Sequence, residues 1–427
     1  MPSPPGYRQQ TTASAARRNT PPAKARLRRP PSSQQSSSSS PLPASTAATS
    51  TSNNNKTKSG TSPKLTDKNF RSAILDRYGI HISEKVEMNS PFRHFSTKDP
   101  ELAGFEGRIA DWYQQTHPDC HVWLRLNRGE AANQAEQYRN MKSIRENEAK
   151  FSHRGKNYFF KEDDIFSPDD PGRCSSTYFK LEWGPTPDDK HLRRPPPVRP
   201  SASDEEDARH FAFNTNPDCT YWLTVRRLNS TYRQLVTTVT HVLPDANVTA
   251  PYLTIEFKKD HTSFDAAENQ VAVSAALILF NRVRLRCRRL EACGRKPETW
   301  TEDDFADIKH YGIAFSACEA SFYIGRPSLS FGVLAAGAEL QHPWRGCTLS
   351  RFTICNAVHE DEILEIKRWV NEIHNWGLGE HSRNFVLDVK GVLVHNPGGR
   401  DRISLLPEEI AALGLETDQP SEESAPI

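Results

Sequence analysis

Glu256 and Lys258 are the residues of this sequence whose types and spacing best suit chemistry. They lie in the segment 252–260, which reads YLTIEFKKD. Its β-branched and aromatic residues indicate a strand, and residues two apart in a strand point to the same face. Glu256 and Lys258 therefore share one face, with Ile255 and Phe257 on the other. Charge on a strand that packs against a buried helix needs partners or a metal ion, because unpaired charge is costly there.

This pair suits the hydrolysis of phosphodiester bonds. Two carboxylates can bind Mg²⁺ (or Mn²⁺), since such ions prefer hard oxygen ligands. The metal activates water and neutralises charge that develops on the phosphate. A lysine on the same face can orient the water and stabilise the transition state. The hypothesis requires a second carboxylate near Glu256; without one, Glu256 and Lys258 are an ordinary same-face ion pair on a solvated strand.

A mixed sheet covered by helices is expected to position these residues. The helix expected at 266–289 is apolar on nearly all sides at its centre, which predicts burial against the sheet. The helix expected at 360–376 is amphipathic and should end at Gly377. We expect strands or short strand pairs at 219–228, 234–243, 252–258, 311–325, 347–357 and 385–394. The predicted fold class is thus α/β with a mixed sheet, in a core domain that covers 205–400.

The segment 67–183 is predicted to be a mainly helical region in front of this core. The apolar spacing predicts helices, with Gly79 as the stop of the first, and two short strands. The helices are expected at 67–78, 100–116 and 129–150, and the strands at 158–160 and 177–183. Residues 184–204 are rich in proline and charge, which is typical of a linker or insertion. Residues 401–427 are expected to form a short helix and a polar tail.

The segment PYLTIEFKKD, followed by the glutamine-bearing helix ENQVAVSAALILFNR, resembles fungal nuclease-like proteins of the PD-(D/E)XK superfamily. The resemblance covers about residues 205–390 and is strongest over 217–281. It implies a restriction-endonuclease-like fold, cleavage of nucleic acid and a metal ion held by an aspartate together with Glu256. It also implies that Gln270 supports the site, although a polar residue near a helix start explains Gln270 equally well.

Asp218 and Asp245 are the two candidates for the metal-binding aspartate. In the superfamily, the aspartate begins one strand of a hairpin whose other strand ends at Glu-x-Lys, so the two carboxylates lie side by side. Asp218 opens the strand-like run CTYWLTV and meets this requirement. Asp245 leads into ANVTAP, which Pro251 makes turn-like, and it stands too close to Glu256 for two strands and a turn. We favour Asp218 and keep Asp245 as the alternative.

Five arginines crowd the end of the helix expected at 266–289. Cationic groups near a helix C-terminus complement its dipole, but five in eight residues exceed that need. The second interpretation is a phosphate-contacting patch. The residues are Arg282, Arg284, Arg286, Arg288 and Arg289, of which Arg282, Arg286 and Arg289 are the candidates for nucleic-acid contact.

Composition separates a basic tail from an acidic body. Residues 1–66 carry ten Lys or Arg and no Asp or Glu, which leaves 45 basic against 53 acidic residues in 67–427. The tail is rich in Ser, Pro and Thr and is expected to be disordered. Its cluster 24–29 (KARLRR) favours nuclear import, and no segment is apolar enough for a membrane span. The eight cysteines are expected to be reduced thiols, because no secretory signal is seen.

These patterns favour a metal-dependent nuclease that acts on DNA or RNA. A second interpretation is a nuclease-fold protein that binds nucleic acid or a protein partner without cleaving. The acidic body favours the second interpretation, because it leaves no large phosphate-coating surface. A third is a structural interaction module with a disordered tail.

Overall fold

The structure of the chain is a computed structural model that describes about three fifths of the residues. The described residues are 64–83, 108–118, 120–161, 175–177, 195–198, 211, 213, 217–225, 228–243, 247–258, 264–331, 343–396 and 403–415. All of them belong to the second of the chain's two units, Gly60–Ile427. The predictions for the basic tail, for the cluster 24–29 and for most of the linker 184–204 fall outside these ranges.

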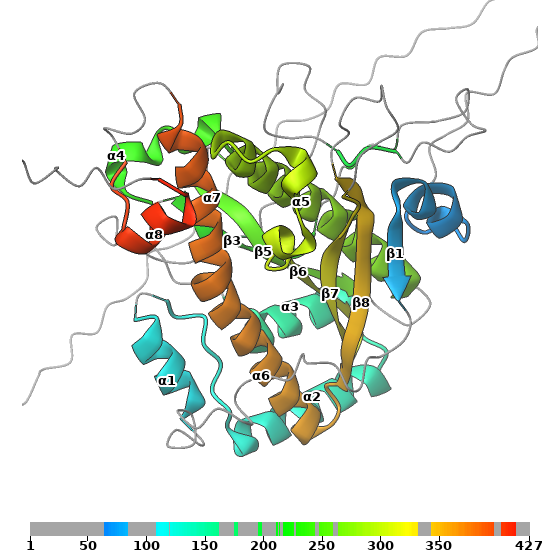
Figure 1. Cartoon of the computed structure of the whole chain (residues 1–427). Helices are drawn as coiled ribbons and strands as arrows, with labels where there is room; N and C mark the ends of the chain where they lie inside the picture. The colour runs from blue at the N-terminus through cyan, green and yellow to red at the C-terminus, as the bar shows by residue number, and fades with distance from the viewer. Residues whose placement is uncertain are drawn as a thin grey trace, which may run out of the picture. The chain divides into compact units, whose positions relative to one another are not determined.

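A mixed sheet lies at the centre of the described fold (Figure 1). Its strands are β1 Ile80–Ser83, β2 Ser175–Thr177, β3 Cys219–Thr224, β4 Val242–Leu243, β5 Val248–Lys258, β6 His310–Ser316, β7 Glu319–Leu329 and β8 Trp344–Asn356. They follow the order β1-β8-β7-β6-β5-β3-β2, and β4 pairs with β5. The pairs β5/β6 and β1/β8 are parallel, whereas the other neighbours are antiparallel. The expected mixed sheet is therefore confirmed.

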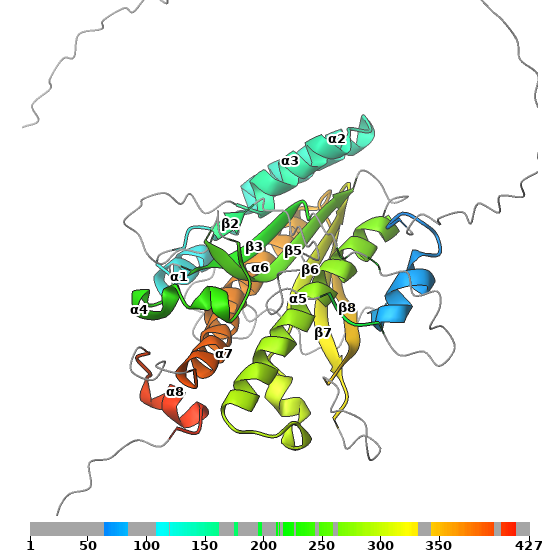
Figure 2. The same ribbon diagram turned by 90° about the horizontal axis from the view of Figure 1, so that it is seen from above.

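Helices cover both faces of this sheet (Figure 2). They are α1 Ile109–Thr116, α2 Arg128–Ser143, α3 Glu148–Phe159, α4 Ser230–Arg233, α5 Phe264–Ala292, α6 Glu360–Trp376, α7 Ser382–Val394 and α8 Pro407–Ala412. The long helix α5 connects β5 to β6 and packs on one face. Helices α2, α3 and α6 pack on the other face. None of the described helices is long and apolar enough to cross a membrane.

Alternation along β5 divides its side chains between the two layers. Leu253, Ile255 and Phe257 join the core shared with α3 and α6. Glu256 and Lys258 therefore point to the opposite face, which α5 covers. Ala314, the β6 partner of Glu256, also packs with the residues of α5. The two layers thus place the candidate charges under the first turns of the buried helix.

A bulge in β5 accommodates a proline inside a strand. Tyr221 pairs with Leu253 and Leu223 pairs with Thr249, so three residues of β5 face the single residue Trp222. Ala250 in this bulge has a φ of 45°. Proline has no N–H for the ladder and is tolerated at such a site. The prediction that Pro251 makes residues 246–251 a turn is wrong, because β5 begins at Val248 and continues through the bulge.

Several predicted elements are confirmed with changed bounds. The strands expected at 219–228, 252–258 and 347–357 appear as β3, β5 and β8, and the one at 311–325 is the hairpin β6–β7. The helix expected at 266–289 is α5. A short π-helical and 3₁₀ segment, Arg71–Tyr78, ends at Gly79 with φ 68°, as the glycine predicted. Only Val242–Leu243 of the strand expected at 234–243 forms.

Three predicted elements are wrong. The helix expected at 129–150 is two helices, because the side chain of Asn147 accepts a hydrogen bond from the Lys150 N–H and starts α3 afresh. Residues 158–159 end α3 instead of forming a strand. The expected strand pair 385–394 is α7, whose buried residues Phe385, Val389 and Val392 follow a helical period. By contrast, the helix expected at 360–376 is α6 with Gly377 as its C-cap residue, although the backbone continues through a π-helical segment, Gly377–His381, into α7.

Candidate active site

Glu256 lies fully buried near the C-terminal end of β5. Its exposed fraction is 0%, and neither of its carboxyl oxygens accepts a hydrogen bond. A buried carboxylate without donors is costly, so a group in this state needs a proton or a cation. This agrees with the expectation that a charge on this strand needs a partner or a metal ion.

Asp218 lies directly across the sheet from Glu256. Cys219 is paired with Ile255 in the antiparallel ladder, so the preceding residue of β3 faces the following residue of β5. The Oδ2 atom of Asp218 accepts a hydrogen bond of 2.8 Å from the Phe257 N–H, which fixes the carboxylate at this strand end. Residues opposite each other in such a pair have Cβ atoms about 4.5–5.5 Å apart. The two carboxylates therefore lie close together, where β3 begins and β5 ends.

Lys258 forms an ion pair with this carboxylate pair at Glu256. Its Nζ lies 3.8 Å from the Oε2 of Glu256, and its side chain is 17% exposed. The same Nζ donates a hydrogen bond of 2.9 Å to the Phe257 carbonyl. Lys258 is thus held at the rim of the site, where it faces both the buried carboxyl group and solvent.

Burial raises the pKa of Glu256 well above its usual range, and the Asp218 carboxylate raises it further. Lys258 lowers this pKa but does not outweigh the other two effects. Like charges that share a site disfavour double ionisation, and burial does the same. A cation bound between the two carboxylates would reverse the balance, because it favours their ionised forms.

Gln270 lies on the side of α5 that faces β3 and β5. Ile278 packs against Trp222 and Val248, and Gln270 is eight residues earlier on the same helical face. That spacing is about 12 Å along a helix. Asp218 precedes Trp222 by four residues, which is about 13 Å along a strand. Gln270 is therefore level with the carboxylate pair, and its side chain is half-buried.

Two hydroxyl groups extend the polar character of this face, and neither was predicted. Thr220 is paired with Thr254 in the β3/β5 ladder, and Ser316 is paired with Lys258 in the β5/β6 ladder. Both are fully buried, and their side-chain oxygens have no hydrogen-bond partner. They were missed because a lone Thr or Ser in a strand is common, and only the pairing of strands brings them beside Glu256.

The donor set fits a hard divalent cation. Two carboxylates face each other, and the oxygens of Glu256 have no hydrogen-bond partner. Within the described ranges, no group of three or more His, Cys, Asp or Glu side chains could hold a metal ion. Mg²⁺ suits a site with few protein ligands, because it keeps several of its waters. The alternative ligand Asp245 lies outside the described residues.

Arg282, Arg286 and Arg289 do not form the exposed phosphate-contacting patch that we expected. Arg282 and Arg286 are 6% and 5% exposed. All three pair with Asp388 of α7, at N–O distances between 2.7 and 3.2 Å. Arg286 also pairs with Asp307 at 2.7 Å. The prediction is wrong because the counter-charges come from distant parts of the sequence, and the arginines instead join α7 to α5.

Comparison of the chain with family models, with curated proteins and with solved structures found no match. What this site can do must therefore follow from the residues of β3, β5 and α5 themselves.

Proposed function

We propose that the chain is a metal-dependent nuclease-like protein of the PD-(D/E)XK type, which hydrolyses phosphodiester bonds of nucleic acid. The observation that carries this proposal is the pairing of Asp218 with Glu256 across β3 and β5, with the Glu256 oxygens buried and without donors. The antiparallel pair β3/β5 supports it, because the resemblance implies a hairpin with one carboxylate on each strand. The crossover from β5 through α5 to the parallel strand β6 places the helix over this pair.

The residues of the site divide the chemical work. Asp218 and Glu256 would hold a Mg²⁺ or Mn²⁺ ion, which supplies an activated water and neutralises charge on the phosphate. Glu256 must lose its proton to bind a cation, and Lys258 favours that loss. The ammonium group of Lys258, at the rim, can then orient the water and stabilise the negative charge of the transition state. Gln270 would support the pair from the α5 side.

A cleavage assay with matched variants tests this proposal. The full chain would be incubated with single- and double-stranded DNA and RNA, with and without Mg²⁺ or Mn²⁺. We expect metal-dependent cleavage that falls by about 100-fold or more in Glu256→Gln and in Lys258→Met, because each variant removes a group that acts in the transition state. The exposed residues Glu136 and Lys142 provide the matched controls Glu136→Gln and Lys142→Met. Equal cleavage by the control and site variants would refute the proposal.

Binding without cleavage is the second candidate function, and the charge of the body favours it. Residues 67–427 hold more acidic than basic residues, so the body has little positive charge with which to coat phosphates. The ten basic residues of 1–66 would supply contact that does not depend on sequence. Salt-sensitive binding of labelled DNA or RNA, with no cleavage under any metal, would favour this candidate over the nuclease.

A further inference from the structure

The N-terminal segment 65–78 contacts the first turns of α5. Arg71 forms an ion pair with Glu268 at 2.6 Å, and its Nε donates to the Oδ1 of Asn269 at 3.2 Å. The Nδ2 of Asn269 in turn donates to the carbonyl of Leu65 at 2.9 Å. The segment is therefore joined to two consecutive residues of α5, and the next residue along the helix is Gln270.

Glu268 is the centre of these contacts. It is 6% exposed, and the hydroxyl of Tyr323 on β7 donates to its Oε1 while Arg71 pairs with its Oε2. Both carboxyl oxygens thus have a partner, in contrast to those of Glu256. Removing one partner of a buried ion pair is costly, because the remaining charge is left unpaired. Glu268 therefore ties the segment, the helix and the sheet to one another.

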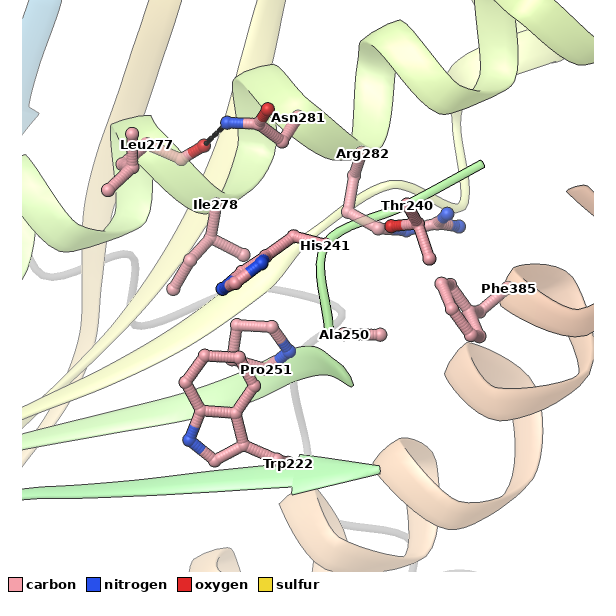
Figure 3. A pocket seen from close by; sticks show the side chains of 10 residues that line it. All are labelled: Trp222, Thr240, His241, Ala250, Pro251, Leu277, Ile278, Asn281, Arg282 and Phe385. Atoms are coloured by element: carbon pink, nitrogen blue, oxygen red, sulfur yellow. Dashed lines mark hydrogen bonds between the residues drawn. The ribbon is translucent and has the colours of Figure 1, made fainter. Parts of the chain in front are cut away.

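Gln270 lies on the opposite side of α5 from these contacts. Figure 3 shows Ile278 pointing from α5 toward Trp222 of β3, and Gln270 precedes Ile278 by eight residues on that face. Gln270 follows Glu268 by two residues, which is about 200° around the helix. Gln270 thus faces β3 and β5, whereas Glu268 faces β7 and the segment 65–78. The first turns of α5 lie between the segment and the carboxylate pair.

We propose that Arg71 is a positioning residue of the candidate active site. By pairing with Glu268 it fixes the first turns of α5, and with them the place of Gln270 beside Asp218 and Glu256. Helix ends fray unless other contacts hold them, which makes these side-chain contacts decisive for a group so close to the helix start. The inference rests on the proposed function, because it requires Gln270 to support the site.

Hydrogen exchange tests the first step of this proposal, from Arg71 to α5. In Arg71→Met, the backbone amides of residues 268–272 should exchange about tenfold faster, because local opening becomes easier when the contacts of this helix end are lost. Lys68→Met removes an exposed charge from the same segment and is the matched control, so it should leave these rates unchanged. Equal exchange rates in the two variants would overturn the proposal.

A mutant cycle with Gln270 tests the second step, from α5 to the site. We expect Arg71→Met to lower both kcat and the affinity for Mn²⁺ by about tenfold, as the loss of a group that orients a metal site does. In the Gln270→Ala background, Arg71→Met should cause no further loss, because the group that it positions is gone. A merely structural role would lower both backgrounds equally and would overturn the proposal. Calorimetric titration with Mn²⁺ measures the affinity without cleavage.

Glu268→Gln keeps the test decisive if Arg71→Met fails to fold. The amide oxygen can still accept from Tyr323, and no buried carboxylate is left unpaired, but the ion pair is lost, so the same coupling with Gln270 is expected. If the wild type cleaves and the cycle shows no coupling, the role of Arg71 fails while the proposed function stands. If the wild type neither cleaves nor binds Mn²⁺, the proposed function fails, and the role of Arg71 fails with it.

Discussion

The ionised form of Glu256 lowers the stability of the fold. Its carboxyl group is fully buried beside Asp218, and no donor compensates it. A carboxyl group whose pKa is higher in the folded than in the unfolded state binds more protons when folded. Its contribution to the free energy of unfolding therefore falls as pH rises from the unfolded pKa toward the folded one.

Glu256→Gln should accordingly stabilise the protein in the absence of metal. The amide has nearly the same shape and cannot ionise, so we expect the free energy of unfolding at pH 8 to rise by at least about 1 kcal/mol, which is about 2–4 °C in Tm for a domain of this size. Urea and thermal unfolding would measure the change.

The pH dependence of this gain distinguishes ionisation from packing. The gain should be small near pH 4, where Glu256 is protonated in both states, and should grow as the unfolded carboxyl group ionises above about pH 4.3. Saturating Mg²⁺ should stabilise the wild type and not the variant. A gain that is equal at pH 4 and pH 8 would contradict the raised pKa of Glu256.

At the scale of elements, the distance between α5 and the sheet determines how far Gln270 lies from Asp218 and Glu256. Gly312 of β6 is a point of close approach, because a Cβ atom at this position would lie 2.2 Å from the Cγ1 of Val271. Both residues are buried, so neither side of the contact can move freely. The missing side chain of Gly312 thus sets the height of the helix above the active strand.

Gly312→Ala should therefore displace α5 and lower the free energy of unfolding by about 1–3 kcal/mol, as overpacking of a core does. Val271→Ala in the same chain removes the clashing methyl groups and should restore part of the loss. Chemical unfolding of the two single variants and the double variant would measure their coupling. Additive losses, with no recovery in the double variant, would show that Gly312 and Val271 do not set this spacing.

The sequence predicted the elements of the site better than their surroundings. The strand with Glu256 and Lys258, the strand that follows Asp218 and the helix α5 were each predicted, because strong local patterns mark them. The antiparallel pairing of the two strands was expected from the family resemblance. The helix α7 was taken for strands, since its valines and leucines fit both periods. The arginines of α5 were misplaced because Asp388, which pairs with them, is about 100 residues away. The hydrophobic pattern of a segment indicates its secondary structure, whereas the burial and pairing of its charged residues depend on contacts with distant parts of the chain.

At the scale of the whole molecule, three buried histidines make the fold sensitive to acid. Burial lowers the pKa of His310, His374 and His381 to about 3 in each case. They are held by different elements, namely β6, α6 and the segment that joins α6 to α7. Unfolded histidines take up protons below about pH 6.5, whereas these three stay neutral in the fold. Stability is therefore complete above that pH and is lost as pH falls from about 6.5 toward 3.

We expect the free energy of unfolding to fall below pH 6.5 by about 1.4 kcal/mol per pH unit for each of these histidines. The measurement is best made in Glu256→Gln, because ionisation of Glu256 gives a slope of the opposite sign. In that background, His310→Gln should remove about one third of the slope between pH 6.5 and 5, while the exposed His153→Gln should leave it unchanged. A slope unaltered by His310→Gln would show that His310 is not buried in its neutral form.

The pairing of the α5 arginines with Asp388 also bears on how the chain acquires its fold during synthesis. Arg282 and Asp388 are 106 residues apart. Similarly, β1 can pair only after β8 has been made, because Ile80 pairs with Cys347. At about 5–20 residues per second, the ribosome needs about 5–20 s to make the segment between Arg282 and Asp388. During that time Arg282 and Arg289 lack Asp388, their partner in the fold, while Arg286 can already pair with Asp307. The nascent chain must therefore keep this helix end hydrated or shielded until α7 emerges.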